Sequence, residues 1–227
     1  MKPVLLCLGL ALAACSTIPP SNRSAARPYR ALGTEPFWSV TLGDRQMTFE
    51  SPEAPPVVMP LPAPRTQGQG RRYETPRLTM DIAPGPCSDG MSDRRYADRV
   101  TVVMDGRRLE GCGGDVLAPA RLDGTAWAIV EIGGAAVSGE AYHLQFESGR
   151  LRGQAGCNRF SGLYQESDGT LAPGPVVATR MACPGPRMDH ELQVMELLSG
   201  PVRFEHPDGD TLVLTGSGRT IRLRRSI

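Results

Sequence analysis

Residues 141–156, AYHLQFESGRLRGQAG, carry the pattern that decides the fold. Tyr142, Leu144 and Phe146 alternate with polar residues, which is the spacing of a β-strand with one face against a core. The dipeptide Ser148-Gly149 predicts a tight turn, and Leu151 begins the return strand. We therefore expect an antiparallel hairpin with one apolar face.

The same design recurs towards the N-terminus. Residues 100–111 (VTVVMDGRRLEG) alternate around an Asp-Gly turn, and residues 37–50 (FWSVTLGDRQMTFE) put Trp38 and Val40 on one face. Residues 51–70 are crowded with proline and glycine, so an edge strand or a long surface loop is expected there. The whole chain of 227 residues holds 26 glycines and 21 prolines, which favours short strands joined by many turns.

One helix is expected, in residues 187–200 (RMDHELQVMELLSG). Met188, Leu192, Met195 and Leu198 recur there at helical spacing. We expect this helix to pack on the second domain.

A domain boundary is expected in residues 113–120, GGDVLAPA, where glycine, proline and small residues interrupt the strand pattern. After this stretch the alternation starts again. The fold class is therefore mostly β, a β-rich α+β protein with two small antiparallel sheet or barrel-like domains. The first would span residues 30–118, and the second, with the one packed helix, residues 119–227.

The N-terminus, MKPVLLCLGLALAACS, is typical of an export signal. Its apolar run, residues 4–13, is too short to cross a bilayer as a helix, which needs about 20 residues. The run ends in Leu-Ala-Ala-Cys, which resembles the lipobox of bacterial lipoproteins. This resemblance implies cleavage after residue 14, lipid on Cys15 and a tether over residues 15–29. By the same resemblance Ser16 favours the outer membrane, and an ordinary signal peptide is the alternative.

Four cysteines remain once the signal and the lipid site are set aside: Cys87, Cys112, Cys157 and Cys183. An even number in an exported protein indicates disulfides, and proximity favours pairing the first two and the last two. A tetrahedral zinc site would use the same four side chains, although no Cys-x-x-Cys spacing is present. A catalytic thiol at one of them would need an activating base.

The chain shows no recognisable catalytic motif. The histidines, His143, His190 and His206, lie outside any such motif, and no Gly-x-Ser-x-Gly elbow or phosphate-binding glycine loop is present. Loss of Lys2 with the signal lowers the 25 basic residues to the number of acidic residues, 24. A neutral chain argues against nucleic acid as a partner. We expect no enzyme activity, no metal and no cofactor, with a hydrolase of unseen site as the last alternative.

The second half also resembles a known family. Its residues 149–164 (GRLRGQAGCNRFSGLY), 179–183 (TRMAC) and 210–216 (DTLVLTG) are similar to the META domain, the family of the heat-shock protein HslJ. The resemblance implies a bacterial envelope lipoprotein linked to heat shock and stress, without established catalysis. In the first half, GTEPFWSVTL and CSDGMSDRRY resemble an uncharacterised bacterial lipoprotein domain found with META.

Residues 87–99 (CSDGMSDRRYADR) are dense in charge, with Asp89, Asp93, Arg94 and Arg95. One interpretation is a solvated loop with local ion pairs. The other is a binding loop held by a disulfide, because rigid scaffolds often carry function on their loops. Such a loop could insert into a partner, as inhibitors of lytic enzymes do.

Together these features predict a non-catalytic, lipid-anchored envelope protein on the periplasmic face of the outer membrane. Its role would be structural or stress-protective. Its expected partners are the membrane, through the N-terminal lipid (a palmitate-type acyl anchor), and an unidentified envelope protein. The alternative is a periplasmic inhibitor of a lysozyme-type enzyme that acts through residues 87–99.

Overall fold

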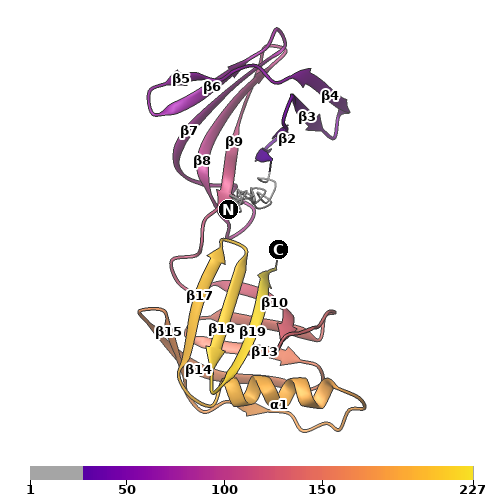
Figure 1. The fold of residues 1–227 in the computed structure, drawn as a ribbon, viewed down its shortest axis with the longest axis vertical. Helices are drawn as coiled ribbons and strands as arrows, with labels where there is room; N and C mark the ends of the chain where they lie inside the picture. The colour runs from indigo at the N-terminus through magenta and orange to yellow at the C-terminus, as the bar shows by residue number, and fades with distance from the viewer. Residues whose placement is uncertain (1–27, 227) are drawn as a thin grey trace, which may run out of the picture.

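The computed structural model describes residues 28–226, and the expected signal, the lipid site Cys15 and most of the tether lie outside them. Two β-sheets follow one another along the molecule, and they share no strand (Figure 1). The predicted fold class, mostly β with one helix, is confirmed. Between the last strand of the first sheet and the first strand of the second lie residues 117–124, which contain the boundary expected at 118/119.

The first sheet is antiparallel, open and curved like half of a barrel. Its spatial order is β4-β3-β2-β1-β9-β8-β7-β6-β5. The strands are β1 (Tyr29–Thr34), β2 (Phe37–Leu42), β3 (Gln46–Ser51), β4 (Ala54–Pro60), β5 (Arg65–Gln67), β6 (Gly70–Glu74), β7 (Leu78–Ser88), β8 (Arg95–Met104) and β9 (Arg107–Val116). The proline-rich stretch forms the edge strand β4, as its composition allows.

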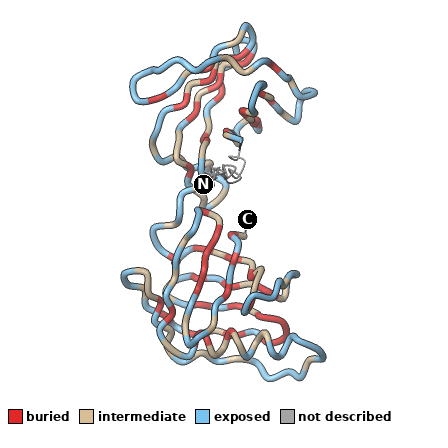
Figure 2. The backbone as a smooth tube through the Cα atoms, in the orientation of Figure 1, coloured by how far each residue is buried: buried red, intermediate tan, exposed pale blue. Residues whose placement is uncertain are grey.

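The core of the first domain lies on one face of this sheet. Buried and exposed residues alternate along its strands (Figure 2). Trp38 is 3% exposed and lies across from Gly33 of β1. A Cβ atom on Gly33 would fall 2.1 Å from the indole Nε1 of Trp38, so only glycine leaves room for this ring. Phe37, by contrast, is 55% exposed.

The second sheet closes on itself, because β19 pairs with β10 and completes a barrel. Its strands are β10 (Thr125–Ile132), β11 (Ala135–Ala136), β12 (Tyr142–Glu147), β13 (Arg150–Ala155), β14 (Arg159–Ser167), β15 (Thr170–Pro173), β16 (Val177–Ala178), β17 (Val202–Asp208), β18 (Thr211–Gly216) and β19 (Arg219–Arg225). The short strands β11 and β16 pair with β10 and β14 outside the closed ring.

The predicted hairpins are present with the predicted turns. β12 and β13 pair from Tyr142↔Ala155 to Glu147↔Arg150, with Ser148 and Gly149 at the turn. Both turn residues have positive φ, 53° and 70°, which is the conformation that a tight two-residue hairpin turn requires. Asp105-Gly106 turns in the same way between β8 and β9. The inward side chains of this second sheet, led by the fully buried Trp127, form the second core.

The helix α1 (Arg187–Leu197) forms where it was expected and packs on the second domain. Met188 and Leu192 are 46% and 58% exposed, whereas Val194 and Leu197 are fully buried. The helix contacts the barrel at β10, β13 and β19, and only its C-terminal turns supply buried side chains. Of the four residues at helical spacing, Met195 and Leu198 pack on the core, whereas Met188 and Leu192 face outward. Within residues 28–226, no helix is both long and apolar enough to cross a bilayer.

Candidate functional site

Only residues 89–94 of the charged stretch form a loop, because its first two residues belong to β7 and residues 95–99 belong to β8. Asp89 holds this loop together. The Asp89 carboxylate accepts hydrogen bonds from the backbone amides of Met91 (3.1 Å) and Ser92 (3.0 Å) and from the Ser92 hydroxyl. Desolvation raises the pKa of Asp89, but these hydrogen bonds and one from Tyr96 outweigh it and leave the pKa below its ordinary 3.8. Asp89 is therefore used to shape the loop.

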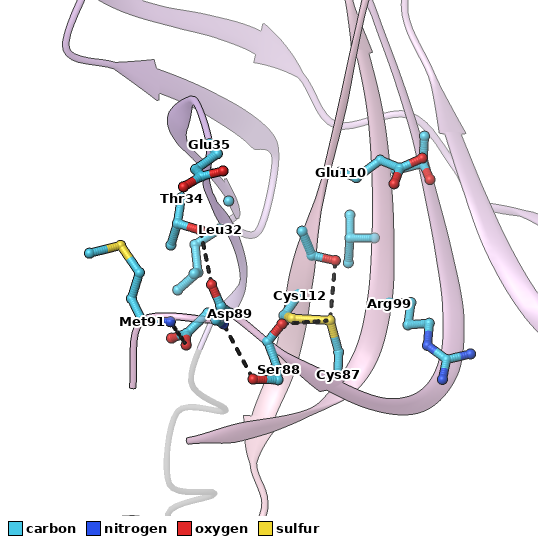
Figure 3. A pocket seen from close by; sticks show the side chains of 15 residues that line it. Leu32, Thr34, Glu35, Cys87, Ser88, Asp89, Met91, Arg99, Glu110 and Cys112 are labelled. Atoms are coloured by element: carbon cyan, nitrogen blue, oxygen red, sulfur yellow. Dashed lines mark hydrogen bonds between the residues drawn. A yellow bond between two sulfur atoms is a disulfide. The ribbon is translucent and has the colours of Figure 1, made fainter. Parts of the chain in front are cut away.

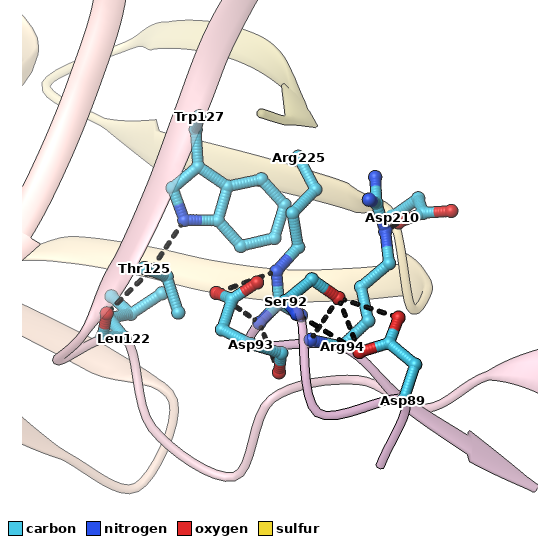
Figure 4. A network of polar contacts seen from close by, with 9 residues as sticks. All are labelled: Asp89, Ser92, Asp93, Arg94, Leu122, Thr125, Trp127, Asp210 and Arg225. Carbon is cyan, nitrogen blue, oxygen red and sulfur yellow. Dashed lines mark hydrogen bonds and ion pairs between the residues drawn. The ribbon is translucent and has the colours of Figure 1, made fainter. Parts of the chain in front are cut away.

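The side chains of Asp93 and Arg94 extend from the loop and contact the second domain (Figure 4). The Arg225 guanidinium donates from Nη2 to the Asp93 carboxylate at 2.6 Å and from Nε at 3.2 Å. Arg94 donates from Nε to Asp210 at 3.0 Å. The first domain supplies the acid in one ion pair and the base in the other. We call this contact between the domains, formed by Asp93, Arg94, Asp210 and Arg225, the joint. This pattern sets the register in which the two domains meet.

Arg225 is the centre of the joint. Its side chain is only 2% exposed, and its guanidinium carbon lies 5.5 Å from the centre of the Trp127 ring, within cation–π range. The Trp127 indole donates to the Thr125 hydroxyl at 2.6 Å, which fixes the ring (Figure 4). Asp93 therefore neutralises an almost fully buried cation at the end of the barrel. Leaving that cation unpaired would be costly.

His206 packs against the same tryptophan. Its ring stacks on Trp127 with centroids 5.6 Å apart, and its Nδ1 contacts the Thr211 carbonyl at 3.1 Å. Desolvation lowers the pKa of His206 below its ordinary 6.5, and the nearby charge of Arg225 acts in the same direction. The neutral imidazole is therefore the form that this site favours.

The structure brings three of the four predicted loop residues into one network and leaves Arg95 exposed outside it. The sequence reading missed Asp210 and Arg225. A signal for Arg225 was present, because Ile221, Leu223 and Arg225 alternate along β19 and all three are buried. An arginine in phase with core residues indicates a buried partner of opposite charge.

A hollow of about 590 Å³ lies beside the same loop, on the first domain (Figure 3). The Cys87–Cys112 disulfide borders it, and Thr34 donates to the Asp89 carbonyl at 2.9 Å and holds the loop to β1. Its lining includes the carboxylate of Glu110, which is ion-paired with Arg108.

The second disulfide, Cys157–Cys183, lies beside a buried amide in the other domain. Asn158 is 2% exposed and its amide is fully hydrogen-bonded. The amide oxygen accepts from the Met181 amide and the Thr179 hydroxyl, both at 2.7 Å. The amide nitrogen donates to the Met181 carbonyl at 3.0 Å and to Glu191 of α1 at 2.8 Å. Asn158 thus ties β14, residues 179–183 and α1 together.

The four cysteines form two disulfides, Cys87–Cys112 and Cys157–Cys183, which is the pairing that the sequence favoured. None of the four therefore carries a free thiol. The zinc alternative is wrong, because it needed all four in one cluster. In the part of the chain that the structure describes, no three His, Cys, Asp or Glu side chains are grouped to hold a metal ion.

Comparisons with known proteins bear on the second domain. The META domain family matches residues 120–226, so the predicted resemblance is confirmed. A protein from Burkholderia xenovorans with an NMR structure is 26% identical, over 46% of this chain and 83% of its own, with a TM-score of 0.40. A second NMR structure is 21% identical, over 44% of this chain and 87% of its own, with a TM-score of 0.39. No curated protein matches the chain significantly.

Proposed function

From the META domain in residues 120–226 we propose a non-catalytic protein of the bacterial envelope with a structural or stress-protective role. META domains suggest a family tied to the envelope or to stress and are not known as enzymes. We further propose that Cys15 carries lipid and that the protein faces the periplasm from the outer membrane. The lipobox-like N-terminus supports this anchoring.

One observation carries the proposal: the charged stretch in residues 87–99 joins the chain's own two domains. Asp93 and Arg94 are paired with Arg225 and Asp210, and Asp89 shapes the loop. Each domain is also crosslinked by one disulfide. Constraints of this kind favour a stable scaffold over a site built for chemistry, because catalytic acids and bases need free access to a substrate.

The first experiment is intact-mass analysis and non-reducing peptide mapping of the protein purified from envelope fractions. Diacylglyceryl and acyl mass on Cys15, together with linkages 87–112 and 157–183, would support the anchored scaffold. A free thiol at Cys157, or a mature N-terminus without lipid, would contradict it. Crosslinking in the envelope would then identify the protein partner.

The inhibitor alternative has less support. It assigns partner binding to residues 87–99, but Asp93 and Arg94 would first have to leave their partners in the second domain. Ser88, Met91, Arg95 and Arg99 are the exposed side chains of this stretch that remain to contact an enzyme. If Ser88→Ala, Met91→Ala, Arg95→Glu and Arg99→Glu together leave lysozyme-type activity in the envelope unchanged, this alternative is excluded.

A further inference from the structure

Exposed apolar side chains gather on one part of the barrel. Of the nine large apolar side chains exposed in the described residues, five belong to β14, β16, α1 and the segment between them. We call these five the apolar surface: Leu163, Val177, Met181, Met188 and Leu192. A single exposed apolar residue is ordinary, but a concentration marks an interaction site.

The strand and helix geometry places these residues on outward faces. Val177 pairs with Ser161 of β14, and Leu163 follows Ser161 by two residues, so Leu163 and Val177 share the outer face. Met188 and Leu192 are four residues apart on α1 and lie on one side of it. Met181 lies in the segment that links β16 to α1.

That linking segment is exposed and yet rigidly held. Asn158 binds both the amide and the carbonyl of Met181, and the Cys157–Cys183 disulfide fixes the residue two positions further on. Thr179 continues the pairing with β14 by donating its amide to the Arg159 carbonyl at 3.0 Å. A preformed surface loses less conformational entropy on binding than a loose loop does.

Basic side chains surround the apolar surface. Arg150, Arg159, Arg180 and Arg187 are exposed, and within residues 28–226 none has a carboxylate at ion-pairing distance. Arg152, nearby, is paired with Glu147, and Asp189 is the exposed acid on α1. A hollow of about 450 Å³, lined by Arg152, Arg159 and Val177, has room for an anionic headgroup.

We infer that the apolar surface and its arginines dock on an anionic lipid bilayer. Methionine, leucine and valine would enter the interface while the guanidinium groups meet lipid phosphates, which is the chemistry of peripheral membrane contacts. The inference rests on the lipid anchor proposed for Cys15, which would hold the chain near the membrane. The helix α1, which carries Met188 and Leu192, lies at the end of the barrel away from the first domain (Figure 1).

The expected tether is long enough for this contact. Thirteen residue steps separate Cys15 from Pro28, where the described chain begins, and an extended chain of that length reaches roughly 45 Å. The nine residues of β14 rise only about 30 Å along the barrel. The far end of the barrel can therefore reach the membrane while the lipid stays inserted.

The test uses the chain from Ser16 onward, exported with a cleavable leader so that disulfides form but no lipid is added. Every strand of both sheets is retained in it. Binding is measured by co-sedimentation with phosphatidylcholine vesicles, with and without phosphatidylglycerol. We expect binding only with phosphatidylglycerol, weakened by salt, and reduced on the order of a hundredfold by Arg159→Gln, Arg180→Gln and Arg187→Gln together. Met188→Ser with Leu192→Ser should weaken it separately.

The matched control removes three exposed arginines elsewhere: Arg30→Gln, Arg45→Gln and Arg95→Gln. It has the same net charge as the first triple variant. An equal loss of vesicle binding in both would mean that the overall charge, and not the position of the arginines, causes binding, and would overturn the inference. Absence of vesicle binding by the parent chain would also overturn it and direct the search for this surface's partner to a protein. Neither outcome touches the lipid on Cys15, which intact mass tests independently.

Discussion

At the residue scale, Asn158 illustrates how one buried amide can hold three segments. Asn158→Ala removes four side-chain hydrogen bonds and leaves the groups of Met181, Thr179 and Glu191 unmatched. We expect a loss of about 3 kcal/mol in the free energy of unfolding, measured by urea denaturation. Gln154→Ala, which removes one bond to the Cys157 carbonyl, is the control and should cost about 1 kcal/mol. Equal losses would show that the Asn158 network has no special weight.

His206 should make stability depend on pH. Because its pKa is depressed in the folded protein, the unfolded chain takes up a proton first as the pH falls through the ordinary value of 6.5. The folded state therefore loses stability from that point downward, until the pH passes the lower folded pKa. His206→Phe keeps a ring against Trp127 and should remove this part of the pH dependence in chemical denaturation. His143→Phe should keep it, and identical profiles for both variants would contradict the assignment.

At the scale of single elements, the apolar side chains of the helix α1 differ widely in burial. Leu197 is fully buried whereas Leu192 is 58% exposed. Leu197→Ala should lower the free energy of unfolding by about 2–5 kcal/mol, and Leu192→Ala by no more than about 0.5 kcal/mol. Thermal or urea unfolding of the two variants measures the difference. The reverse order would mean that Leu192, and not Leu197, packs on the barrel.

The outcome for α1 shows where sequence patterns stop being informative. Hairpins such as residues 141–156 could be predicted because alternation and a turn dipeptide are local signals. The closure of the second sheet depends on β10 pairing with β19, which lie far apart in the chain, and no local signal reports that. The helix carries apolar residues on more than one side, so only the barrel decides which side is covered.

The candidate site, too, could be predicted from the sequence only in part. Its charged loop was visible in the composition of residues 87–99, but its partners were not, because Asp210 and Arg225 lie more than a hundred residues away. The pairing of each disulfide was accessible, since each closes a short loop within one domain. What the sequence left open was the direction in which Asp93 and Arg94 point. The contact between domains settles that question.

At the scale of the whole molecule, the joint between the domains is a polar one. Asp93–Arg225 and Arg94–Asp210 supply its charged contacts, and the turn after β17 approaches β9 closely. A Cβ atom on Gly209 in that turn would fall 2.0 Å from the Val116 carbonyl oxygen. Domains of one chain that meet through a small polar contact move relative to each other unless specific pairs hold them. We therefore expect the two ion pairs to determine how the domains are placed relative to each other. The fold of each domain should not depend on them.

Reversing both charges of the loop tests this directly. Asp93→Lys with Arg94→Glu keeps the net charge and sets like charges against Arg225 and Asp210. Because Arg225 is nearly buried but Asp93 is 38% exposed, we expect a loss of about 2 kcal/mol of docking free energy. Small-angle scattering should show a larger radius of gyration, and proteolysis within residues 117–124 should speed up.

The matched control is Asp44→Lys with Arg45→Glu, the same dipeptide in an exposed turn of the first domain. It should leave the radius of gyration and the cleavage rate unchanged. Adding Asp210→Arg to the reversed loop recreates one pair with its charges exchanged and should recover part of the compact shape. If the reversed loop alone stays as compact as the parent chain, backbone contacts such as that of Gly209 hold the domains and the ion pairs are accessory.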